Sequence, residues 1–467
     1  MERTRFNIGR MSAMICCMCL LYSGIIACSN DDPVVNIADP AHTTEEPVDT
    51  AQYTIIVYGN AGGTMDNIME FVWENTKPMV HLGGDVRLIY LYKYGNDLVD
   101  AEGNHSFTGK YADPGSVVYF EIHNRLPLDS IRSHATIDQD FELFNYYNLK
   151  YLLNDIAHNA PARNYIFVTW GHGASFDVSH DIPWDLKLPA EQLTRGILYD
   201  ETLNGSALDM YEFSRAVEES DINHFKAIFF HNCQMGNLES LTQMSPYTDY
   251  IISSAHVLYS GGTTLLQLVQ SLTNGETFEQ TAESMARTMI EYEKNGYIQS
   301  GMNGDMNVMR SDALPEINAL VRKLAYWLCA NYQNHQDAIN RATDRVYGFV
   351  KGYEFYDIAD YAEKIAEETG DETVADISRQ LHAVFNRAFV QTVKVDFPEN
   401  PTIPQYTLSV ALLDNHTYLT AKPFADYSYG LIYSGTAFHQ QTGWGNWLSV
   451  NTHLPTGNPW GQNPFGL

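Results

Sequence analysis

Cysteine is scarce in this chain of 467 residues, and the cysteines that are present are not arranged as a disulfide framework. Three of the six fall within the first 27 residues; the six are Cys16, Cys17, Cys19, Cys28, Cys233 and Cys329. The body of the chain therefore holds two thiols far apart in sequence, which argues against the small secreted folds that depend on disulfides. Cys329 lies in an apolar pattern with helical spacing and is predicted to be a core residue.

Basic residues are also scarce, with 28 Lys and Arg against 57 Asp and Glu, a formal net charge of −29. Such a surface repels phosphate backbones and anionic headgroups, so nucleic acid is not expected as a partner. The charge would attract cations, which leaves calcium open as a ligand although the chain has no EF-hand loop. A zinc site built from His172, His180, His231 and Cys233 would match no common structural spacing. We therefore expect no required metal or cofactor.

The chain has no apolar run long enough for a convincing membrane span. Its start, residues 1–27, has Arg3, Arg5 and Arg10 before an interrupted apolar run that begins at Met11, which is the layout of a secretory signal peptide. The run ends Ile-Ile-Ala-Cys at Cys28 and resembles a bacterial lipobox, whose cysteine becomes acylated after signal removal. The alternative is an ordinary signal cut near Ala27.

Residues 28–50 are predicted to be a disordered acidic tether. From Ser29 to Thr50 there are six carboxylates and three prolines, but no Lys, Arg or aromatic residue, so this segment cannot bury enough apolar surface to fold. Its start, Ser-Asn-Asp-Asp, resembles the surface-display signal of some Gram-negative lipoproteins. That resemblance predicts a lipid anchor in the outer membrane or at the cell surface, and a merely solvated linker is the alternative.

Apolar strands alternate with helical patterns from residue 51 to about residue 275. The predicted strands cover residues 53–58, 86–92, 117–122, 165–170, 227–230 and 250–254. This alternation predicts an α/β domain with a mainly parallel sheet and helices on both faces. Helical spacing dominates residues 276–392. Strand-like alternation near residues 406–412 and 430–434 predicts a small β-rich subdomain over residues 393–467.

Two of these strands are followed by residues that can act in catalysis. The run YIFVTWGHG places His172 between two glycines, and KAIFFHNCQMGNLE places Cys233 after an apolar run, 61 residues later. The carboxyl ends of neighbouring parallel strands meet at one edge, where α/β sheets place their ligands. A helix starting at Cys233 would favour the thiolate. A thiol and an imidazole brought together suit acyl transfer, although either residue alone is more often inert.

These motifs resemble the clostripain-like cysteine peptidases, relatives of caspases, gingipains and legumains. The resemblance rests on Trp-Gly-His-Gly at His172, on His-Asn-Cys-Gln-Met at Cys233, on the segment at residues 196–216, and on TAFHQQTGWGNWL at residues 436–448. It extends over residues 53–450 and implies a caspase-like fold. It also implies that Cys233 is the nucleophile, that His172 protonates the leaving amine, and that the N–H groups of Gly173 and Cys233 form the oxyanion hole.

One departure from the family changes the expected specificity. Members carry an aspartate two residues before the cysteine, in the pocket for a basic side chain, and this chain has His231. The family's Ser-Glu-Glu stretch corresponds to Ser254-Ala255-His256, so a second source of negative charge is missing from the pocket. A pocket without carboxylates does not offset the desolvation of Arg or Lys, and we expect a neutral or acidic side chain before the cut.

Other interpretations stay open at this point. In relatives the segment between the two catalytic strands can hold an activating cleavage site, and Lys187 and Arg195 would be the candidates here if basic specificity were retained. A surface-exposed lipoprotein that binds glycans or peptides without chemistry would also fit the tether and the 30 tyrosines and 7 tryptophans, as would an inactive peptidase relative. A serine hydrolase is disfavoured because the chain has no Gly-x-Ser-x-Gly elbow.

Overall fold

The computed structural model describes residues 50–60, 70–71, 74–75, 85–110, 113–123, 132–137, 143–173, 197–199, 207–258, 262–299, 301–349, 355–412, 433 and 436–451. All of them belong to one compact unit, Ile37–Leu467. The predicted signal peptide and tether, with Cys28, lie outside the described residues, as do His180, Lys187 and Arg195.

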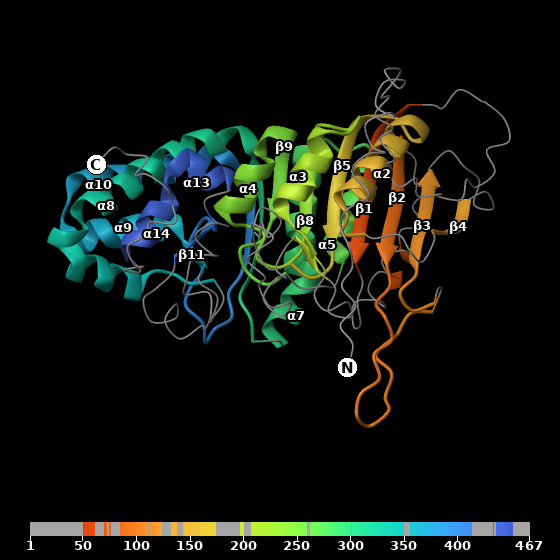
Figure 1. Cartoon of the computed structure of the whole chain (residues 1–467), viewed down its shortest axis with the longest axis horizontal. Coiled ribbons are helices and arrows are strands. Elements are labelled where there is room, and N and C mark those ends of the chain that lie inside the picture. Colours follow the sequence, from red (N-terminus) through yellow and green to blue (C-terminus); the bar gives the residue numbers. More distant parts are fainter. Residues whose placement is uncertain are drawn as a thin grey trace, which may run out of the picture. The chain divides into compact units, whose positions relative to one another are not determined.

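A nine-stranded sheet forms the centre of the described fold, in the order β12-β10-β9-β8-β5-β1-β2-β3-β4 (Figure 1). Its five middle strands pair in parallel; they are β9 (Thr248–Ser253), β8 (Phe225–His231), β5 (Ala162–Trp170), β1 (Ala51–Asn60) and β2 (Val86–Lys93). Antiparallel strands extend both edges; they are β3 (Val117–His123), β4 (Arg132–Ile137), β10 (Gly304–Arg310) and β12 (Phe389–Val395). The prediction of a mainly parallel α/β sheet is confirmed.

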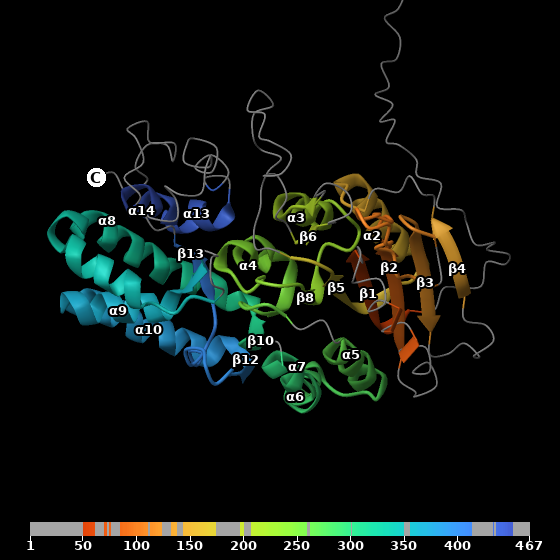
Figure 2. The same cartoon turned by 90° about the horizontal axis from the view of Figure 1, so that it is seen from below.

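Helices cover the two faces of this sheet (Figure 2). On one face lie α2 (Tyr146–Asn159), α3 (Met210–Glu218) and α4 (Leu238–Met244), and on the other α5 (Thr263–Thr273), α6 (Phe278–Thr288) and α7 (Lys294–Gln299). Short 3-10 turns η6 (Ser245–Tyr247) and η8 (Ser311–Ala313) and a π-turn η7 (Met289–Glu293) join these elements.

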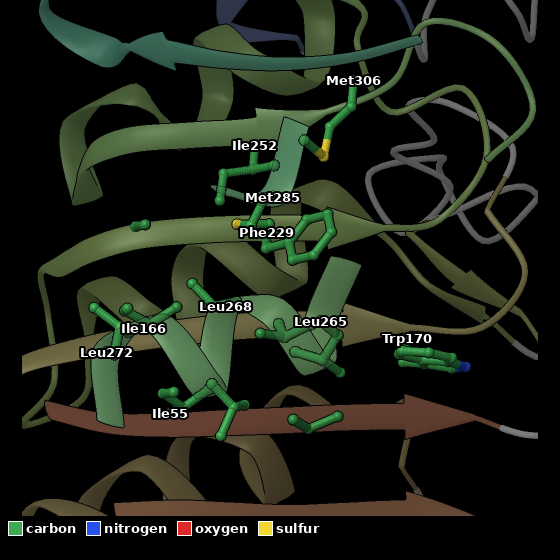
Figure 3. Close-up of a cluster of buried hydrophobic side chains, with 14 of the residues drawn as sticks. Ile55, Ile166, Trp170, Phe229, Ile252, Leu265, Leu268, Leu272, Met285 and Met306 are labelled. Atoms are coloured by element: carbon green, nitrogen blue, oxygen red, sulfur yellow. The ribbon is translucent and has the colours of Figure 1, made fainter. Parts of the chain in front are cut away.

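Strand alternation divides the core between the two helical layers, since successive side chains point to opposite faces. Ile166 and Phe229 belong to the buried cluster that also contains Leu268 and Met285, and Figure 3 shows these side chains together. On the opposite face, the ring of Phe213 in α3 lies 5.2 Å from that of Phe167 and 6.5 Å from that of Phe230, centroid to centroid. The middle strands are therefore buried on both sides, as their unbroken apolar runs predict.

The second half of the chain differs from its predicted division. Residues 276–392 do contain long helices, namely α8 (Leu314–Arg345), α9 (Ile358–Thr369) and α10 (Glu372–Ala388). However, β10 and the start of β12 also lie there and extend the main sheet, and β11 (Phe355–Asp357) pairs with β13 (Ser409–Ala411). Beyond residue 393 the described residues hold the end of β12, β13, and the helices α13 (Ala437–Thr442) and α14 (Trp444–Asn451). Residues 413–432 are not described.

Candidate active site

His172 and Cys233 follow directly paired strands. β5 and β8 run parallel in register from Ile166↔Ala227 to Trp170↔His231, so both chains leave the sheet at the same edge. Figure 3 shows Trp170 at the arrowhead end of its strand. A two-stranded ribbon, β6 (Leu198–Tyr199) with β7 (Ala207–Leu208), precedes α3 between the two motifs.

The turn that carries His172 depends on both of its glycines. Gly171 has a φ of +142°, and a Cβ there would lie 2.5 Å from the carbonyl oxygen of Asn60 at the end of β1. A Cβ on Gly173 would lie 2.5 Å from the Cβ of Asn232 and 3.0 Å from the carbonyl oxygen of Cys233. The backbone that follows His172 is thus packed directly against the backbone that carries Cys233.

Asn232 links the two strand ends. Its Nδ2 donates to the carbonyl oxygens of Gly171 at 2.9 Å and His172 at 3.4 Å, and its Oδ1 accepts a hydrogen bond from the hydroxyl of Thr169. Asn232 is 1% exposed. Because these hydrogen bonds are buried, the Asn232 side chain fixes the position of the backbone at His172 relative to the backbone at Cys233. Sequence reasoning missed Asn232, although a polar residue between a buried strand and the cysteine was a visible signal.

The loop after Cys233 differs from the prediction. We expected a helix to begin at the cysteine, but α4 begins at Leu238 with Asn237 as its N-cap. Cys233 lies in a turn, where its Sγ is 3.9 Å from the carbonyl oxygen of Leu258. Burial raises the pKa of the Cys233 thiol, so the predicted stabilisation of the thiolate by a helix dipole is wrong for this structure.

The backbone N–H groups of Gly173 and Cys233 are the predicted donors of the oxyanion hole. Among the described residues no acceptor is hydrogen-bonded to either group, whereas the next amide in the loop, that of Gln234, donates to the carbonyl oxygen of His256 at 2.9 Å. Two neighbouring free amides beside a thiol form the kind of site that stabilises an oxyanion.

His231 is buried in an aromatic stack. Its ring lies parallel to that of Trp170, with centroids 4.0 Å apart and planes inclined by 7°, and edge-on to that of Phe229. Burial lowers the pKa of His231 to about 3, so the ring is neutral at physiological pH. Its Nε2 has no hydrogen-bond partner in the described part of the chain.

Ser254 and His256 belong to a buried polar network around Asp305. The Ser254 hydroxyl donates to Asp305 Oδ1 at 2.7 Å, and His256 Nδ1 lies 2.7 Å from the same oxygen. Ser254 is 0% and His256 2% exposed, so the structure places both side chains inside the protein and not on an open surface. Asp305 was not singled out from the sequence, because it lies in β10, whose polar residues hide the strand pattern.

Comparison with known proteins identifies the chain. The sequence model of the clostripain family, Peptidase_C11, matches residues 128–440, which is more than half of the chain. The chain belongs to the clostripain family. It is a cysteine-type endopeptidase, and its substrates are peptides or proteins.

Solved structures share the fold of this clostripain-family chain. A secreted C11 cysteine protease from Bacteroides thetaiotaomicron, iotapain, has a TM-score of 0.58 at 14% identity, with 84% of this chain and 100% of that chain covered. A secreted C11 cysteine protease from the same organism with an irreversible peptide inhibitor gives 0.56 at 12%, covering 85% and 99%. An inactive zymogen C11 protease from Parabacteroides distasonis gives 0.55 at 16%, covering 84% and 99%. The predicted caspase-like fold is confirmed, and curated proteins gave no match.

Two features are absent from the described residues of this clostripain-family chain. No helix among them is sufficiently long and apolar to cross a membrane. No group of three or more His, Cys, Asp or Glu side chains among them is arranged to hold a metal ion.

Proposed function

We propose that this clostripain-family enzyme is an exported, lipid-anchored endopeptidase in which Cys233 and His172 form the catalytic dyad. The observation that carries the proposal is the contact of Gly173 with Asn232 and Cys233, because it brings the thiol, the imidazole turn and two free amides to one point of the sheet edge. The two side chains need not share a hydrogen bond in the free enzyme, because catalytic hydrogen bonds often tighten only when substrate is bound.

The reaction proceeds in two steps. Cys233 passes its thiol proton to His172 and its sulfur bonds to the scissile carbonyl carbon, while the N–H groups of Gly173 and Cys233 donate to the developing oxyanion. The C–N bond then breaks as His172 delivers a proton to the leaving amine, and an acyl-enzyme forms. Water attacks the thioester with His172 as base, which releases the acid and restores the thiol. No cofactor takes part in these steps.

The side chain before the cut is proposed to be neutral or acidic. His231 stands where the family's aspartate contacts a basic side chain, and its buried, uncharged ring offers no opposite charge to a guanidinium. Asp305 does not replace that charge, because its oxygens are taken up by Ser254, His256 and Thr407.

Export and anchoring rest on the N-terminal sequence. Residues 1–27 would be the signal, Cys28 the acylated residue, and residues 28–50 the tether to a body that begins near residue 51. Two structural relatives are described as secreted, which supports export. Metabolic labelling with an alkynyl fatty acid should mark the wild type and not Cys28→Ser. Equal labelling of both would refute the anchor.

A substrate library tests the proposed dyad and the proposed specificity. Peptide amides that differ at the residue before the cut would be offered to the soluble body and to its Cys233→Ala and His172→Ala variants, with and without a calcium chelator. We expect turnover of neutral or acidic substrates that disappears in both variants and survives chelation. Preferred cleavage after Arg or Lys would contradict the proposed specificity but not the proposed dyad. Turnover that persists in Cys233→Ala would contradict the dyad.

A further inference from the structure

The loop from Cys233 to Gly236 is held in a conformation that it would not adopt by itself. Gln234 has a φ of +61°, and it is the one non-glycine residue with positive φ among those described. A residue with a side chain pays about 1–2 kcal/mol of conformational free energy to adopt the left-handed backbone region. Surrounding contacts must therefore hold Gln234 in that region. A Cβ on Gly236 would lie 2.7 Å from the backbone nitrogen of Ala255, so the loop is pressed onto its neighbour.

Two carbonyl groups of the segment 254–256 provide these contacts. The Gln234 amide donates to the His256 carbonyl oxygen at 2.9 Å, and the Gly236 amide donates to the Ser254 carbonyl oxygen at 2.7 Å. The position of Cys233 therefore depends on the conformation of a segment that follows the end of β9, outside the regular sheet.

One carboxylate, that of Asp305 in β10, organises the segment 254–256. Its oxygens accept the Ala255 amide at 3.2 Å and the His256 amide at 3.0 Å, in addition to the Ser254 hydroxyl and His256 Nδ1. Asp305 is 0% exposed. Burial alone would raise the pKa of Asp305, but its electrostatic interaction with His256 and hydrogen bonds from His256, Thr407 and Ser254 outweigh burial and hold the pKa below its usual value.

The far side of the His256 ring is fixed by a hydroxyl group. His256 Nε2 lies 2.9 Å from the Tyr347 hydroxyl, which also accepts a hydrogen bond from Asn303 Nδ2 at 2.8 Å. The rings of Tyr347 and Phe349 stand edge-on to the imidazole. Both ring nitrogens of His256 are thus bound inside the protein.

We propose that Asp305, His256 and Tyr347 are positioning residues for the nucleophile, which they hold in place through the carbonyl groups of the segment 254–256. This inference rests on the proposed role of Cys233. It assigns His256 to the support of the cysteine loop, not to the wall of a substrate pocket.

Two pairs of variants test the inference, with the turnover of wild type and Cys233→Ala measured first. Asp305→Asn should lower kcat about a hundredfold and leave KM nearly unchanged, because an ångström-scale displacement of a catalytic group has an effect of that order. Its control is Asp371→Asn at the N-cap of α10, where asparagine can accept the same hydrogen bonds from Thr373 and Val374. Tyr347→Phe should lower kcat several-fold with a modest fall in melting temperature, because His256 Nε2 and Asn303 Nδ2 lose a partner. Its control is Tyr406→Phe, which loses a hydroxyl bond to Asn386.

The rate at which iodoacetamide alkylates Cys233 gives a second readout, which should fall with kcat in Asp305→Asn and Tyr347→Phe and stay constant in the controls. Wild-type kcat and alkylation rate in folded Tyr347→Phe would overturn the inference, even if Asp305→Asn failed to fold. A rise in KM alone would also overturn it and would favour a pocket role for His256. Absence of turnover in the wild type would instead refute the proposed function.

Discussion

The turn at His172 and the loop at Cys233 lie against each other but are stabilised in different ways. The His172 turn is specified locally, since Gly171 and Gly173 permit contacts that a Cβ would block. The Cys233 loop contains a strained Gln234 and relies on Ser254, His256 and Ser409, whose amide donates to the Gly236 carbonyl oxygen at 2.9 Å. One half of the site is thus encoded in three adjacent residues, and the other half in segments brought together by the fold.

The largest effect is expected for Gly171→Ala. The new Cβ would meet the Asn60 carbonyl oxygen at 2.5 Å at an unfavourable φ, so unfolding free energy should fall by about 3 kcal/mol. The control is Gly370→Ala, where φ is +65° but a Cβ would meet nothing within 4 Å, and about 1 kcal/mol should be lost. Urea unfolding measures both. Equal losses would mean that close packing does not specify the turn.

Asn232→Asp tests the connection between the two regions. The substitution keeps the shape but removes the Nδ2 donor to Gly171 and His172, so kcat/KM should fall by about a hundredfold. Asn318→Asp is a matched control, because Asn318 is equally buried but bonds to Thr242 and Gln441. The same loss of activity per folded molecule in both variants would show that Asn232 has no special role in alignment.

The cysteine side should also respond to pH through Glu239 in α4. Burial raises the pKa of Glu239 to about 7, and that of Asp357 similarly to about 7. Each group holds a proton in the folded state that the unfolded chain releases, so the stabilisation is complete below the usual carboxyl pKa and is lost as the pH rises through 7.

Between pH 6.5 and 8.5 each of these carboxyl groups should account for about 1 kcal/mol of lost stability. This window begins at the usual histidine pKa of 6.5, so most of the opposite contribution of the buried His231 and His439 falls below it. Glu239→Gln should flatten the profile by one group's share in denaturant titrations at a series of pH values. A Glu239→Gln profile with the wild-type slope would contradict the raised pKa of Glu239.

The smallest effect is expected for Gln234→Gly. Relief of the left-handed strain should stabilise the protein by about 0.5 kcal/mol, because the greater freedom of an unfolded glycine offsets part of the gain. The melting temperature should therefore rise slightly while kcat stays constant or falls. A clear loss of stability would indicate that the Gln234 side chain, and not the surrounding backbone, holds the loop.

The difference between the locally specified His172 turn and the Cys233 loop, which distant segments hold in place, explains what could be predicted from the sequence. Continuous apolar runs predicted the middle strands and the edge at which His172 and Cys233 meet, since both signals are local. The position of α4, five residues beyond Cys233, depends on how Gly236 packs against Ala255. The roles of Asp305 and Tyr347 depend on contacts across 49 and 91 residues from His256, and no local pattern carries them. β10 was missed because its polar residues, such as Asn307, interrupt the strand pattern.

The most direct test of the central claim is mass-spectrometric mapping of an adduct formed with a peptidyl ketone electrophile that carries a neutral residue before the reactive group. We expect one adduct per chain, on Cys233 and not on Cys329, formed much more slowly in His172→Ala. Adduct formation on Cys329 or on another residue, or an unchanged rate in His172→Ala, would contradict the proposed dyad.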